Sequence, residues 1–86
     1  MIFNNFETIA ENGRGTHLLR HREKGWHTVV VIDDGQIHPV NRHGGTIGRE
    51  YASATSAGVD AIGFRMSEAE ARRRYELAVN ASAALT

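Results

Sequence analysis

The clearest pattern in this chain is a run of β-branched and aromatic residues from Trp26 to Ile32, which stops at Asp33-Asp34-Gly35-Gln36. Such a run is typical of a strand, and Asp-Gly between two apolar runs is a strong signal for a tight hairpin turn. Residues 37–40 then predict a short returning strand. Because its proline cannot donate to a ladder of hydrogen bonds, this strand should lie at an edge of the sheet.

The residues upstream predict one or two more strands. Residues 16–22 form a plausible partner strand, joined to Trp26 through a three-residue loop at 23–25 that contains Gly25. The first dozen residues fit either a strand that turns at Asn12-Gly13 or a short helix ended by Gly13, and we favour the strand.

A helical pattern lies near the C-terminus. Ser67 and Glu70 have the spacing of a capping box, in which each side chain bonds to the backbone of the other. An apolar stripe at helical spacing follows, formed by Ala71, Tyr75, Ala78 and Val79. Residues 68–82 are therefore predicted to form an amphipathic helix. The preceding stretch, 42–65, is rich in glycine and then in small polar residues, and a short helix near 49–57 would fit it.

These elements together predict one α+β domain over residues 1–86. Its expected architecture is an antiparallel β-meander of three to four strands packed against one C-terminal amphipathic helix. Eighty-six residues suit a single domain and leave little room for a deep substrate pocket. The chain has no cysteine, no signal-peptide pattern at its start and no apolar run of about 20 residues. A soluble, cytoplasmic protein is the expectation.

Charge narrows the choice of partners. Ten basic and ten acidic residues cancel, whereas a dedicated DNA-binding domain usually shows a basic excess. Residues 14–27 are the one local positive region, and Trp26 there could stack on a base. A single-stranded nucleic-acid-binding accessory protein is therefore one alternative.

The histidines are predicted to share a face of the sheet. A three-residue loop at 23–25 places His21 opposite His27, and alternation along the strands sorts the other side chains. One face then carries His17, Leu19, His21, His27, Val29, Val31, His38 and Val40, and the other carries Leu18, Arg20, Trp26, Val30, Ile32 and Ile37. The helix should cover the second face. His21 and His27 would be close enough to share an ion, but no third ligand is evident, so we expect no metal.

The glycine-rich loop is a candidate for ligand binding. The glycine-rich loop 42–49 lacks the spacing of a Walker A motif, yet its N–H groups, flanked by Arg42, His43 and Arg49, could bind an anion. A phosphate- or nucleotide-binding domain is thus a second alternative. No local nucleophile and base motif is present, so we expect neither enzyme activity nor a cofactor.

In its layout the chain resembles many small phage-encoded inhibitors of bacterial defence, the anti-CRISPR proteins among them. The features that carry the resemblance are small size, zero net charge, absence of cysteine, and a β-meander with one helix. The resemblance covers the whole chain and includes no shared motif, so it assigns no functional residues. It implies a phage protein that blocks a larger bacterial nucleoprotein complex, such as a CRISPR effector, by steric occlusion.

The leading hypothesis is a non-enzymatic protein-binding module that acts by stoichiometric association with a larger protein or nucleoprotein complex. Arginine and tryptophan are the usual energetic centres of interfaces. The predicted partner-binding residues are Arg20, Arg22, Trp26, His27, Arg42 and Arg49. No membrane partner is expected, and a homodimer is left open.

Overall fold

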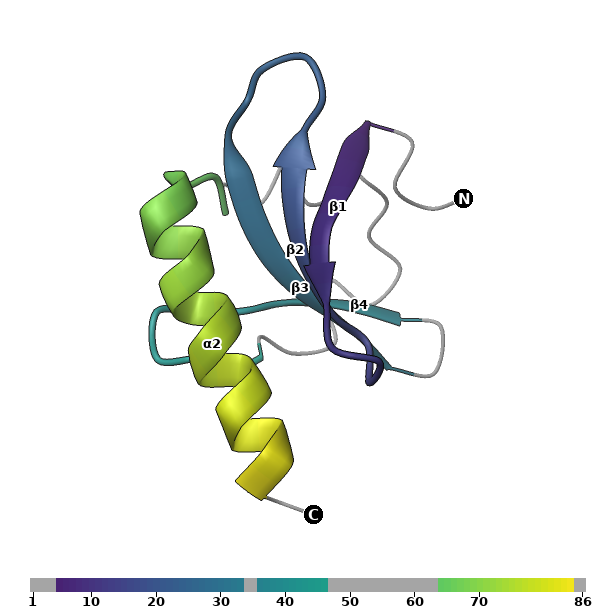
Figure 1. The fold of residues 1–86 in the computed structure, drawn as a ribbon, viewed down its shortest axis with the longest axis vertical. Coiled ribbons are helices and arrows are strands. Elements are labelled where there is room, and N and C mark those ends of the chain that lie inside the picture. Colours follow the sequence, from purple (N-terminus) through teal and green to yellow (C-terminus); the bar gives the residue numbers. More distant parts are fainter. Residues whose placement is uncertain (1–4, 34–35, 47–63, 85–86) are drawn as a thin grey trace.

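The computed structural model describes residues 5–33, 36–46 and 64–84, and these residues form one antiparallel sheet and one helix (Figure 1). The elements are β1 Phe6–Glu11, β2 Thr16–His21, β3 His27–Asp33, β4 Gln36–Pro39 and α2 Glu68–Ala84. The strands lie in the order β1-β2-β3-β4, each antiparallel to the next. The predicted α+β meander is confirmed, and the first dozen residues contribute a strand. The helix expected near 49–57 lies outside the described residues.

Both faces of the sheet carry a hydrophobic core. Leu18 and Leu19 are neighbours in β2, so they point to opposite faces, and each is 0% exposed. One cluster joins Leu18, Val29 and Val40 to Ala71 and Ala78 of α2. The other joins Phe6, Leu19, Val30 and Ile37, with Trp26 and Ile32 packed against it. Burial on both sides explains why β3 is an almost continuous apolar run in the sequence.

The pairing of β2 with β3 differs by one residue from the predicted pairing. Arg20 lies opposite His27, and the N–H of His21 donates to the carbonyl of Trp26. The connecting loop therefore has four residues, 22–25, and a slip of one residue moves side chains to the other face. The predicted gathering of four histidines on one face is wrong. His17 and His21 lie on one face, and His27 and His38 lie on the other.

The second hairpin has the predicted pairing, with Ile32 opposite Ile37. Residues 34–35, where the turn was expected, lie outside the described residues. β4 is an edge strand and contains Pro39, as predicted. At the other edge, the ladder between β1 and β2 is irregular between Thr8 and Ala10, which is a β-bulge.

The helix α2 begins where the sequence predicted it and packs on β2 and β3. Ser67 Oγ accepts a hydrogen bond from the N–H of Glu70 at 3.2 Å, which satisfies one of the free donors at the helix start. The helix covers the face of Leu18 and Val29, so the predicted grouping of Leu18 with Trp26 under the helix is wrong. No helix in the described ranges is long and apolar enough to cross a membrane.

Candidate functional site

Most of the predicted binding residues gather where β2 turns into β3. The loop 22–25 extends beyond the strands at the same end of the molecule as the start of α2 (Figure 1). Arg65, just before α2, lies over the ring of Trp26, and the Arg20 side chain reaches the loop beside Gly25. We name this region the hairpin end and define it by Arg20, Arg22, Lys24, Trp26 and Arg65.

His21 holds the loop of the hairpin end in place. Its Nδ1 accepts hydrogen bonds from the backbone N–H groups of Glu23 at 3.3 Å and Lys24 at 3.1 Å. Its backbone carbonyl accepts a third, from the N–H of Gly25 at 3.0 Å. Gly25 has a φ of 77°, a conformation that glycine adopts without strain. One histidine therefore satisfies three consecutive donors of the loop.

Trp26 is part of an aromatic cluster and is half-buried. Its ring centroid lies 5.2 Å from that of Phe6, edge to face, and 5.1 Å from that of His21. The guanidinium carbon of Arg65 lies 5.4 Å from the Trp26 centroid, within the range of a cation–π contact. Since neighbours already surround this ring, Trp26 does not offer an open platform on which a base could stack. Trp26 Nε1 is buried and has no partner among the described residues.

The charges of the hairpin end are exposed. Arg20 forms a loose ion pair with Glu7, with 3.7 Å between Nη1 and Oε1, and both side chains are largely exposed. Pairs of this kind contribute little to stability. Arg22 and Lys24 project from the loop and form no ion pair within the described part of the chain. These two cations are thus available to an external carboxylate or phosphate.

His27, a predicted partner-binding residue, has its side chain in the interior. It is 7% exposed, and its backbone exchanges two hydrogen bonds of 2.9 Å with Met66, which ties the chain entering α2 to β3. His27 and His21 point to opposite faces and cannot share an ion. No group of three or more metal-ligating side chains occurs among residues 5–33, 36–46 and 64–84.

Asn41 holds the glycine-rich loop through hydrogen bonds. Its Oδ1 accepts hydrogen bonds from the N–H groups of His43 at 2.8 Å and Gly45 at 3.1 Å, and its carbonyl accepts one from Gly44 at 3.0 Å. The donors considered for a phosphate are therefore already satisfied inside the loop. Arg42 is exposed but lies away from the hairpin end, against α2, where its carbonyl accepts from Arg73. Arg49 lies outside the described residues.

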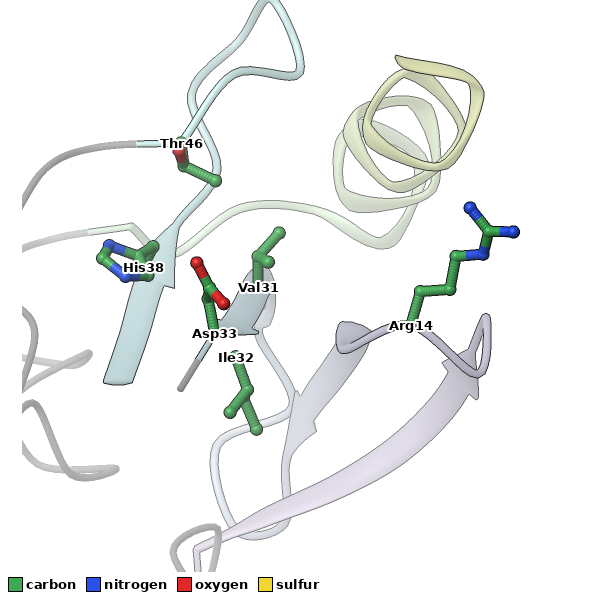
Figure 2. A pocket seen from close by; sticks show the side chains of 6 residues that line it. All are labelled: Arg14, Val31, Ile32, Asp33, His38 and Thr46. Carbon is green, nitrogen blue, oxygen red and sulfur yellow. The ribbon is translucent and has the colours of Figure 1, made fainter. Parts of the chain in front are cut away.

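A separate pocket of about 290 Å³ lies beside the paired strands β3 and β4 (Figure 2). Its described lining consists of Arg14, Val31, Ile32, Asp33, His38 and Thr46. Asp33 and His38 point into the same space from neighbouring strands, whereas Arg14 stands apart on the loop between β1 and β2 (Figure 2). The lining mixes one acidic side chain, two basic side chains, one hydroxyl and two apolar side chains, and these groups do not converge on a single point.

Neither the place of Arg65 in the hairpin end nor the role of His21 beside it was predicted from the sequence. Arg65 follows a stretch without clear periodicity, and it reaches Trp26 only because the bridge between His27 and Met66 brings it there. His21 was predicted to lie on the histidine-bearing face of the sheet opposite His27, and not to hold the loop. A sequence signal for its observed role does exist, because a side-chain acceptor directly before a short glycine-containing loop is well placed to bond loop N–H groups. Comparison with family models, with curated proteins and with solved structures finds no match in any of the three.

Proposed function

We propose that this protein is a non-enzymatic binding module that associates stoichiometrically with a larger protein or nucleoprotein complex through the hairpin end. The carrying observation is that the loop 22–25 is held by three hydrogen bonds to His21 while the side chains of Arg22 and Lys24 remain exposed. A loop that is ordered before binding loses less conformational entropy on association. Exposed cations on such a loop suit an acidic surface on the partner.

The composition of the surface also favours a protein partner over a small ligand. Arginine contributes strongly to interfaces because its planar fork binds carboxylates with two hydrogen bonds. Arg20, Arg22 and Arg65 are at the hairpin end together with Lys24, and Glu7 and Glu23 offset part of this charge. A mixed surface of this kind selects a partner by its pattern of charges.

Inhibition by occlusion is the specific form of this proposal. A chain of 86 residues that covers a site on a larger complex needs no chemistry of its own. The layout shared with anti-CRISPR proteins supports an inhibitor of a bacterial defence complex, and the absence of cysteine suits action in the reducing cytoplasm.

The test is capture of partners from bacterial lysate with tagged protein, with and without nuclease, read by mass spectrometry. We expect a stoichiometric protein partner that survives nuclease. Arg22→Ala should weaken its capture at least about 30-fold, which corresponds to a loss of about 2 kcal/mol.

Arg14→Ala is the matched control, because Arg14 is also an exposed loop arginine without an ion pair in the described ranges, and it lies outside the hairpin end. If Arg22→Ala and Arg14→Ala capture the partner equally well, the hairpin end is not the binding surface. Recovery of the bait alone would contradict the proposal and direct attention to small ligands.

A further inference from the structure

We propose that His21 is a proton-sensitive catch, which holds the loop of the hairpin end at neutral pH and releases it on acidification. This inference rests on the proposed function, because the loop presents the side chains that would contact the partner. Its structural part, the release of the loop, is independent of any partner and is tested separately below.

The geometry requires His21 to be neutral. An imidazole nitrogen can accept a hydrogen bond only when it carries no proton, and Nδ1 accepts from both Glu23 and Lys24. The ring therefore has its proton on Nε2. A second proton, on Nδ1, would place an N–H donor against two backbone N–H donors. The loop cannot keep its present form with His21 charged.

The ring of His21 is buried among other aromatic rings. His21 is 8% exposed and packs against the rings of Phe6, at 5.4 Å between centroids, and Trp26. Within the described part of the chain, no carboxylate bonds to the ring. A protonated His21 would thus be a buried cation without an acceptor, and it is stabilised by moving outward toward water. That movement removes the acceptor from the two loop amides.

Other charged groups near the ring must be considered with it. The loop contributes Arg22, Glu23 and Lys24, the segment before α2 contributes Arg65 over Trp26, β1 contributes Glu7, and β2 contributes Arg20 and His17. Glu7 and Arg20 pair on the opposite face of the sheet. Burial lowers the pKa of His17, with Glu11 acting in the opposite sense, so His17 takes up its proton at a lower pH than an ordinary histidine. Arg22, Lys24 and Arg65 add to the repulsion that a charged His21 would meet.

Release of the loop would weaken binding because the loop would no longer be ordered before the partner binds. Arg22 and Lys24 would no longer be held in one arrangement, and the partner would have to order them itself. The loss of two backbone hydrogen bonds corresponds to a weakening on the order of tenfold.

The structural test is a nuclear magnetic resonance titration of the free protein from about pH 8 to about pH 5, where imidazoles generally titrate. The amide signals of Glu23 and Lys24 should move with the same midpoint as the ring signals of His21. In His21→Asn, an amide oxygen occupies the place of Nδ1 and does not titrate, so the loop amides should no longer respond. His43→Asn changes an exposed histidine outside the hairpin end and should leave the response intact.

The proposal is wrong if the amide signals of the loop do not move while the His21 ring takes up its proton. It is also wrong if the ring stays neutral and the loop stays unchanged over the whole pH range. If His21→Asn does not fold, the titration of the unaltered protein alone decides. The effect on binding is tested by repeating the capture experiment at about pH 8 and at about pH 5. Suppose that the loop is released at low pH but capture of the partner is unchanged, both at low pH and in Arg22→Ala. The role of His21 in holding the loop would then stand, and the hairpin end would not be the binding surface.

Discussion

At the scale of single residues, close approaches between backbone segments restrict which side chains the chain tolerates. Gly44 has a φ of 86° and lies under α2, where a Cβ atom would come within 2.6 Å of the Cβ of Leu77. Gly13 has a similar φ of 78°, but a Cβ there would meet nothing within 4 Å. The two glycines therefore share one backbone conformation and differ in their surroundings.

This difference predicts the effects of two alanine substitutions. Gly13→Ala should lower the free energy of unfolding by about 1 kcal/mol, because alanine is strained in the left-handed region. Gly44→Ala should lower it by a further 1–3 kcal/mol or so, because α2 must also shift away from the loop. Chemical denaturation of both variants measures the difference. Equal losses would mean that α2 does not press on Gly44.

The roles of individual residues were the least predictable part of the site. The types favoured at interfaces led to Arg20, Arg22 and Trp26, and all three belong to the hairpin end. The burial of His27 could not be foreseen, because it depends on a bridge to Met66, which lies 39 positions away. The function of His21 depends on the path of four loop residues, and a change of one residue in that path would remove it.

At the scale of elements, the connection between α2 and the end of β4 depends on one carboxylate. Glu70 bonds Arg73 and Arg74, each at 2.7 Å. The same two arginines donate to the carbonyls of Arg42 at 3.0 Å and Val40 at 3.2 Å. Glu70 thus orients both guanidinium groups toward the loop that leaves the sheet.

These contacts predict acid sensitivity of a defined sign. Hydrogen bonds from Arg73 and Arg74 lower the pKa of Glu70 from the usual 4.5 to about 2. The stabilisation is complete above about pH 4.5, and it is lost as the pH falls toward about 2, because the unfolded chain binds the proton first. As the pH falls from about 4.5 to about 2, the free energy of unfolding should decrease less in Glu70→Gln than in the unaltered protein, as unfolding curves recorded across this range would show. Glu76→Gln removes the same charge from the same helix without breaking an ion pair of the described structure, and an identical effect there would contradict the assignment.

The elements themselves were largely predictable, whereas their register was not. The β-branched composition of β3 and the Ser67 cap are local signals, and local signals sufficed to predict three strands and one helix, with a first strand favoured over a short helix. The turn predicted at Asp34-Gly35 implied the register that β3 and β4 have. The loop 22–25 gave the wrong one, since its length depends on how Trp26 packs between Phe6 and His21, a contact that involves three separate segments.

At the scale of the whole molecule, the hairpin end and the glycine-rich loop differ in which of their polar groups remain available to a ligand. The first is a surface with exposed cations, and the second is a turn whose donors are already satisfied by Asn41. Binding of single-stranded nucleic acid would need an open face on Trp26, and that ring is already covered by its neighbours. Binding of phosphate would need free N–H groups at Gly44 and Gly45, and both groups already donate to Asn41.

A panel of nucleotides and inorganic phosphate should therefore leave the melting temperature unchanged. A ligand present at 100 times its dissociation constant would raise the free energy of unfolding by about 2.7 kcal/mol, which is easily seen in a thermal shift assay. Asn41→Ala, which frees the N–H groups of His43 and Gly45, is the informative comparison. A clear shift in the unaltered protein would favour the phosphate-binding alternative over a protein-binding module.

The bulge in β1 has a consequence for how much of this protein a cell can hold. A flat, regular edge strand templates the addition of further strands and leads to aggregation. Here the β1 edge is interrupted between Thr8 and Ala10, and the β4 edge carries Pro39, which has no N–H to offer a neighbour. The stoichiometric binding proposed above would require the protein in amounts that match its target. Edges that resist the addition of strands allow such accumulation, so the irregularity of β1 bears on the concentration that the protein can reach without aggregating, rather than on its affinity.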